Sequence, residues 1–279
     1  MAAALFACVV LMSCGPNIGN LEKGEEGSVT RALGGDTLEL DSGLRVFLAE
    51  IDAPRGEEEY AAQSRAELEA LALHRKVRLA YGGTRRWVRR VREGELAPEP
   101  QGETAVAHVF VQSEGGRWFW LQHELVARGA AYVRPRRDNH ARGGELMALE
   151  VQARTGERGL WAKRTYRALN PGEASAAALA FADSCQRAAA PYRIVEGRVA
   201  SVFQNERRAA LDFDTTEETG VPGFSAVVFG EAFSGWDGEP LQSFSGARVR
   251  VRGPLGVFRD APQICIDSPL QIETLKPPA

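Results

Sequence analysis

The chain has 279 residues and a formal net charge of −3, with 44% hydrophobic and 25% charged residues. This length exceeds the usual size of one domain, so two domains are expected. The composition is that of an ordinary globular protein, and the slightly negative charge argues against a protein that coats nucleic acid by bulk attraction. Any nucleic-acid binding would therefore depend on local basic patches.

The N-terminus has the features of an export signal. Its first 13 residues are apolar, too few to span a bilayer. Residues 11–14 (Leu-Met-Ser-Cys) are similar to a bacterial lipobox, in which the cysteine is lipidated, although no Lys or Arg precedes the apolar run. We expect residues 1–27, loop-like as far as Glu26, to be a signal and tether whose Cys14 lipid anchors the protein to a membrane of the bacterial cell envelope, facing the periplasm or the exterior. A cytosolic tail is the alternative.

The region that follows predicts a small barrel. Alternating apolar residues broken by glycine-containing turns predict a β-meander over residues 27–54. Further strands are expected at residues 77–81 and 105–111, and helices at residues 57–73, 121–128 and 144–156. Five strands and about three helices are the pattern of an OB-type barrel.

Two carboxylates are expected at strand ends of this barrel. Asp36 follows a glycine pair, and Asp52 precedes Ala-Pro. Carboxylate oxygens at the mouth of a small barrel suit a hard cation such as calcium. Ordinary turn residues are the alternative, because both sequences are common in turns.

Five motifs occur in the order seen in the staphylococcal-nuclease-like (thermonuclease) family, which residues 28–162 resemble. They are Gly-Asp-Thr at 35–37, Arg-Val-Phe-Leu-Ala-Glu-Ile-Asp-Ala-Pro at 45–54, Ala-His-Val-Phe-Val at 107–111, Leu-Val-Ala-Arg-Gly-Ala-Ala-Tyr-Val at 125–133 and Glu-Val-Gln-Ala-Arg-Thr-Gly-Glu-Arg-Gly-Leu-Trp at 150–161. The resemblance implies an OB-type barrel that hydrolyses phosphodiesters with calcium. Asp36 and Asp52 match the two carboxylates that would hold it.

The other catalytic positions implied by the resemblance do not match. Phe47 stands where the first catalytic arginine is expected, Arg55 where a glutamate follows the proline, and Thr104 where the second arginine is expected. Since guanidinium groups stabilise the charge that a phosphate gains in the transition state, we expect a catalytically degenerate domain. The alternative is an active calcium-dependent nuclease with relocated groups. Its replacement residues would be Arg45, Glu57 and one of Arg89 or Arg90.

An arginine-rich run is the strongest positive feature. It is interleaved with an aromatic residue and comprises Arg85, Arg86, Trp87, Arg89, Arg90 and Arg92. Basic side chains beside an aromatic suit single-stranded nucleic acid, and residues 134–142 form a second basic cluster. Alternatives are a solvated face or contact with anionic lipid. His108 and His123 lie in apolar segments and are expected as core or strand residues rather than as ligands.

The second half predicts another barrel. Residues 163–190 are expected to form a helical linker, with a helix over 174–190 that packs on one of the two domains. Five short strands at 194–202, 209–213, 224–229, 247–253 and 263–266 make residues 191–279 similar to an OB-fold-like module. If the protein is exported, Cys185 and Cys265 are expected either to form a disulfide or to remain two unpaired buried thiols.

The predicted fold class is therefore β-barrel plus helices (α+β), with two OB-fold-type barrels joined by a helical linker. The predicted function is binding of nucleic acid or of an envelope protein partner.

Overall fold

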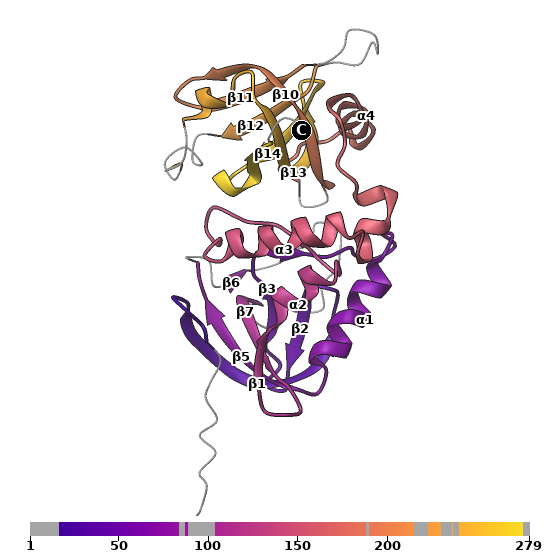
Figure 1. Cartoon of the computed structure of the whole chain (residues 1–279), viewed down its shortest axis with the longest axis vertical. Coiled ribbons are helices and arrows are strands. Elements are labelled where there is room, and N and C mark those ends of the chain that lie inside the picture. Colours follow the sequence, from indigo (N-terminus) through magenta and orange to yellow (C-terminus); the bar gives the residue numbers. More distant parts are fainter. Residues whose placement is uncertain are drawn as a thin grey trace, which may run out of the picture.

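A computed structural model describes residues 17–83, 87–88, 104–187, 190–214, 223–229, 236 and 240–275. These residues form two closed, five-stranded, mixed β-barrels with four α-helices, as Figure 1 shows. The predicted fold class is confirmed. Among the described residues no helix is both long enough and apolar enough to cross a membrane.

The first barrel closes in the order β1-β2-β3-β7-β5, and its one parallel pairing joins β3 to β7. Its strands and their neighbours are β1 (Glu22–Ala32), β2 (Thr37–Leu40), β3 (Arg45–Leu48), β4 (Ile51–Asp52), β5 (Lys76–Tyr81), β6 (Trp87–Val88), β7 (Thr104–Gln112), β8 (Trp118–Trp120) and β9 (Tyr132–Val133). Its helices are α1 (Ala61–Ala72), α2 (Leu121–Ala127) and α3 (Gly143–Thr155). Alternate residues such as Leu38 and Leu40 are buried in its core, as the period-two pattern requires.

Two boundaries of this barrel differ from the prediction. The segment before Gly27 is not loop but the first half of β1, which pairs with β5 from Glu22 onward. That half is mostly exposed and polar, so backbone pairing holds it without an apolar pattern. Helix α1 begins at Ala61 rather than residue 57, because Tyr60 has a left-handed backbone (φ 72°) that separates the preceding acids from the helix.

The second barrel closes through pairing of its first strand with its fourth. Its strands are β10 (Tyr192–Gln204), β11 (Arg208–Phe213), β12 (Ser225–Phe229), β13 (Arg248–Phe258), β14 (Ala261–Ile266) and the edge strand β15 (Ile272–Thr274). Helix α4 (Pro171–Phe181) lies beside β10 and β13 (Figure 1). Short 3-10 helices cover Gly159–Ala162, Arg164–Tyr166, Leu241–Phe244 and Pro269–Gln271.

Helix α4 is shorter than predicted and belongs to the second barrel. Asn170 caps its N-terminus in a capping box, and Ala182 ends it in a left-handed conformation (φ 53°). Ala174 and Ala178 are fully buried in the core of the second barrel. The predicted linker helix therefore packs on the second of the two domains.

A disulfide joins Cys185, just after α4, to Cys265 of β14, with Cα atoms 5.8 Å apart. The described cysteines thus adopt the first of the two alternatives. Cys14 lies outside the described residues.

Helix α3 lies between the barrels (Figure 1). Leu146 packs into the first core, whereas the buried Glu150 forms an ion pair with Arg252 of β13. Tyr132 of β9 stacks on Tyr192 of β10 with ring centroids 5.2 Å apart. The second barrel is therefore packed against the end of the first that carries β9.

Candidate functional site

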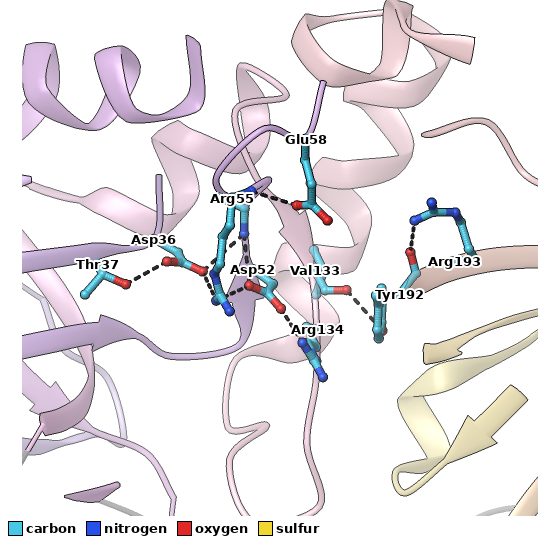
Figure 2. Close-up of polar contacts among 10 residues, drawn as sticks. Asp36, Thr37, Asp52, Arg55, Glu58, Val133, Arg134, Tyr192 and Arg193 are labelled. Atoms are coloured by element: carbon cyan, nitrogen blue, oxygen red, sulfur yellow. Dashed lines mark hydrogen bonds and ion pairs between the residues drawn. The ribbon is translucent and has the colours of Figure 1, made fainter. Parts of the chain in front are cut away.

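Asp36 and Asp52 lie side by side at one mouth of the first barrel (Figure 2). Asp36 immediately precedes β2, and its backbone carbonyl accepts a hydrogen bond of 2.9 Å from the amide of Leu48. Asp52 ends β4, which pairs with β9 through Tyr132. Both carboxylates are buried, with relative exposures of 2% and 5%. The structure thus brings together the two acids that the sequence singled out.

Gly35 allows the Asp36 turn to approach its neighbours closely. A Cβ atom at this position would lie 2.6 Å from the Cβ of Ser64 on α1 and 2.7 Å from the Cβ of Ala53. Neither contact is possible for a real side chain without movement. The glycine before Asp36 therefore fixes the carboxylate against the segment that carries Asp52.

Arg55 bridges the two acids. Its Nη2 lies 2.5 Å from Oδ2 of Asp36 and also donates to Oδ1 of Asp52. The Arg55 backbone amide donates to a carboxylate oxygen of Glu58 at 2.7 Å. Glu58 thus holds the loop in which Arg55 turns back toward the barrel, as Figure 2 shows.

Arg134 pairs with the remaining oxygen of Asp52. The residue follows β9, and its backbone amide donates to the carbonyl of Glu50 at 2.8 Å. Its guanidinium lies 5.1 Å from the ring centroid of Tyr192, which belongs to the second barrel. The second barrel therefore contributes one wall of this site.

All four carboxylate oxygens of the pair accept hydrogen bonds. In Asp36, Oδ1 accepts from the Thr37 hydroxyl at 2.7 Å, and Oδ2 accepts from Arg55 and from the Ala53 amide. In Asp52, Oδ1 accepts from Arg55 and the Ala53 amide, and Oδ2 accepts from Arg134. The acids are fully satisfied by the protein's own donors.

The two acids have opposite pKa shifts. Burial, together with the neighbouring charge of Asp52, raises the pKa of Asp36 to about 6. Burial alone would also raise the pKa of Asp52, but the charges of Arg134 and Arg55 outweigh it and hold that pKa well below its usual range. Asp52 is thus the permanently charged member of the pair, and Asp36 is the member that takes up a proton.

This arrangement does not fit calcium. Calcium takes six to eight oxygen ligands, whereas every carboxylate oxygen here faces an N–H or O–H donor, and the Arg55 guanidinium holds the position between the acids. Among the described residues, no group of three or more His, Cys, Asp or Glu side chains is arranged to hold a metal ion. The calcium that the resemblance implies therefore has no ligand set in this conformation.

The positions that fail to match the catalytic pattern lie in the barrel wall. Phe47 is half-buried on β3, and Thr104 is buried at the start of β7. Arg45 pairs with Glu39 at 3.5 Å across the β2-β3 hairpin, and Glu57 is exposed. Arg89 and Arg90 lie outside the described residues.

Sequence reasoning missed the residues that do reach the acids. Arg55 was treated as a mismatch and Arg134 as part of a surface cluster, yet both guanidinium groups bond the aspartates, and Glu58 lies beside them. The one available signal was a cation three residues after Asp52, a spacing that suits a local ion pair. Nothing in the sequence indicated Arg134.

The structure describes only the second of the two basic clusters in full. The arginine-rich run lies outside the described residues except for the backbone of Trp87 and Val88 in β6, which pairs with the start of β7. Gly83, two positions before the run, packs so tightly that a Cβ there would lie 2.2 Å from the carbonyl oxygen of Asp138. The last described residues before the run therefore lie beside residues 134–142.

The two histidines behave differently. His108 is fully buried, and its Nε2 lies 3.2 Å from Oε1 of the equally buried Glu50. His123 is only half-buried, because it lies on the outer side of α2 near Trp120, so its prediction as a core residue is wrong.

Residues 45–163 match the model of a protein family described as staphylococcal nuclease homologue. The comparison with curated proteins gives no match.

Proposed function

Since residues 45–163 form a staphylococcal-nuclease-type domain, we propose that the protein is a non-catalytic, envelope-anchored member of this fold that binds single-stranded nucleic acid. The Cys14 lipid would hold both barrels at a membrane surface outside the cytosol, and the disulfide between Cys185 and Cys265 suits such an oxidising compartment.

The observation that carries the proposal is the position of Gly82 and Gly83, the described residues that precede the arginine-rich run, beside the second basic cluster. Gly82 packs against Ala141 and Gly83 against Asp138, so the last described residues before Arg85 lie beside the second cluster. In that cluster Arg136 and Arg137 are exposed, whereas Arg134 is bonded to Asp52. Residues 28–162 carry 20 basic and 20 acidic side chains in total. A neutral domain whose sequence holds two arginine-rich stretches would bind phosphates locally rather than over its whole surface.

The neighbouring acids support binding rather than hydrolysis. Arg55 and Arg134 neutralise Asp36 and Asp52, and the positions of both expected catalytic arginines hold Phe47 and Thr104. A guanidinium that is bonded to a buried carboxylate is not free to take the charge of a phosphate in a transition state. The acids inside the barrel are thus neutralised by the protein's own arginines, and phosphate binding is left to other basic side chains.

Binding is tested with a fluorescently labelled single-stranded oligonucleotide and an anisotropy titration over a range of salt concentrations. We expect affinity that falls with salt, and its loss together with a smaller salt slope when Arg85, Arg86, Arg89 and Arg90 are all changed to Ala. The matched control changes four exposed arginines outside both clusters. These are Arg31, Arg65, Arg128 and Arg158. Equal binding by both quadruple variants would refute the proposal.

A second candidate function is phosphodiester hydrolysis with relocated groups. It is favoured by the two arginines, Arg55 and Arg134, that bond the acids, and by Glu58, which accepts a hydrogen bond from the Arg55 amide. Digestion of denatured DNA with added calcium decides between the two functions. Turnover that is abolished by both Asp36→Asn and Asp52→Asn would establish an enzyme, and absence of turnover with retained binding supports the non-catalytic protein. Absence of both leaves an envelope protein as the partner.

A further inference from the structure

We propose that Arg55 is a built-in replacement for a bound cation, and that removing its guanidinium opens a divalent-cation site between Asp36 and Asp52. The inference rests on the proposed function, which also requires that Asp36 and Asp52 of the wild type hold no metal. It goes further, because it assigns the absence of metal to one residue, Arg55.

The geometry of the guanidinium is that of a bridging ion. A single nitrogen, Nη2, contacts Oδ2 of Asp36 at 2.5 Å and also Oδ1 of Asp52, so one positive centre is shared by two carboxylates. In Figure 2 the guanidinium lies between the two acids. Two buried carboxylates at this separation need a cation between them, since their mutual repulsion is not screened by water.

Arg55 also performs the structural role of a bridging ion. Asp36 lies in the turn before β2 and Asp52 at the end of β4, and Arg55 ties these two segments together. The arginine is itself held in place, because its backbone amide donates to Glu58 and its side chain is only about one-third exposed. The bridge is therefore a fixed part of the fold rather than a mobile surface contact.

Loss of the guanidinium would leave an oxygen-rich opening. Oδ2 of Asp36 and Oδ1 of Asp52 would each keep only the amide of Ala53 as a donor, at 3.2 Å in both cases. Calcium takes carboxylate and water oxygens as ligands. The volume left by the guanidinium, on the exposed side of the two acids, would admit the ion and its water. Arg134, on the far oxygen of Asp52, would remain and would weaken the site without blocking it.

The experiment measures metal binding and not activity. Wild type, Arg55→Gln, Arg55→Glu and Arg55→Lys are compared by thermal unfolding with calcium or with EDTA, and by terbium luminescence excited through nearby aromatic side chains such as Tyr132. We expect the melting temperature of wild type and Arg55→Lys to be unaffected by calcium, and that of Arg55→Gln and Arg55→Glu to rise saturably with calcium. Terbium luminescence should appear in the same two variants and vanish when Asp52→Asn is added.

The matched control is Arg65→Gln, which removes an exposed guanidinium from α1 where it pairs with Glu69. Calcium-dependent stabilisation of wild type that Asp52→Asn abolishes would overturn the proposal, whether or not the Arg55 variants fold. Folded Arg55→Gln and Arg55→Glu proteins that show neither stabilisation by calcium nor terbium luminescence would overturn it as well. Nucleic-acid binding is read separately by anisotropy, so its absence would refute the proposed function and leave this inference standing.

Discussion

Arg252 of the second barrel lies 2.7 Å from Glu150 of helix α3, and both side chains are almost completely buried. Glu150 uses its other oxygen to accept the amide of Val133, the last residue of β9. Because β9 pairs with β4, which carries Asp52, a side chain of the second barrel supports the backbone beside the candidate site. The contact between the barrels is thus part of how the site is built.

Arg252→Met is expected to lower the free energy of unfolding by about 3–5 kcal/mol, because it leaves Glu150 buried with only the more distant Arg154, at 3.7 Å, as a counter-charge. Urea unfolding followed by circular dichroism measures the loss. Arg248→Met, at an exposed position of the same strand, should change stability by no more than about 0.5 kcal/mol. Equal effects of the two substitutions would contradict the structural importance of the pair.

Asp36→Asn is expected to remove a pH dependence of stability. The pKa of Asp36 is raised from 3.8 to about 6, so its contribution is fully present below pH 4 and is lost as the pH rises through 6. Between pH 4 and pH 7.5, the free energy of unfolding of wild type should fall relative to that of Asp36→Asn by up to about 3 kcal/mol, since one pKa unit corresponds to about 1.4 kcal/mol. The pKa of Asp52 is shifted in the opposite direction, so its contribution to stability is lost only at lower pH.

The check is urea unfolding of wild type and Asp36→Asn at pH 4.5, 6 and 7.5. Asp41→Asn, which changes an exposed aspartate in the next turn, serves as the control. A difference between wild type and Asp36→Asn that stays constant across this range would show that Asp36 does not titrate there.

Cys185→Ser with Cys265→Ser is expected to cost about 4 kcal/mol, because the disulfide joins residues 80 positions apart and restricts the unfolded chain. Thermal unfolding in the absence of reductant measures the loss. Dithiothreitol should lower the melting temperature of wild type toward that of the double variant and leave the variant itself unchanged. A wild-type protein indifferent to reductant would show that the bond is absent or adds nothing.

Gly35→Ala is expected to destabilise the protein by about 1–3 kcal/mol, because the added methyl group would overlap Ser64 and Ala53. Gly144→Ala is its counterpart. It lies near the start of α3 with no atom within 4 Å of the added Cβ, and alanine favours helix, so we expect no loss. Chemical denaturation of both variants provides the comparison, and similar losses in the two would contradict the tight packing of the Asp36 turn.

The barrels were predictable because their walls alternate. Residues such as Val46 and Leu48 are buried while Arg45 is exposed, and this pattern is visible in the sequence. Strands without such a pattern were missed. The first half of β1 is almost entirely polar, and β9 has only two residues. Both are held by backbone hydrogen bonds to a neighbouring strand, and such pairing leaves no pattern in the sequence.

The site was predictable in part. Asp36 and Asp52 were found because turn chemistry and the resemblance both marked them. The partners of these acids were not found, because Arg134 is 82 positions from Asp52 and meets it through the pairing of β4 with β9. Arg55 stands where the resemblance places a carboxylate, and its direction depends on how the chain turns after Pro54.

The position of α3 bears on how this protein has been inherited. One face of the helix completes the first core through Leu146, while Glu150 depends on a partner that the chain supplies about 100 residues later. A recombination event that joined the first barrel to an unrelated C-terminal half would leave that buried carboxylate with only Arg154 as a counter-charge. The two halves are therefore expected to be inherited together, as one evolutionary unit.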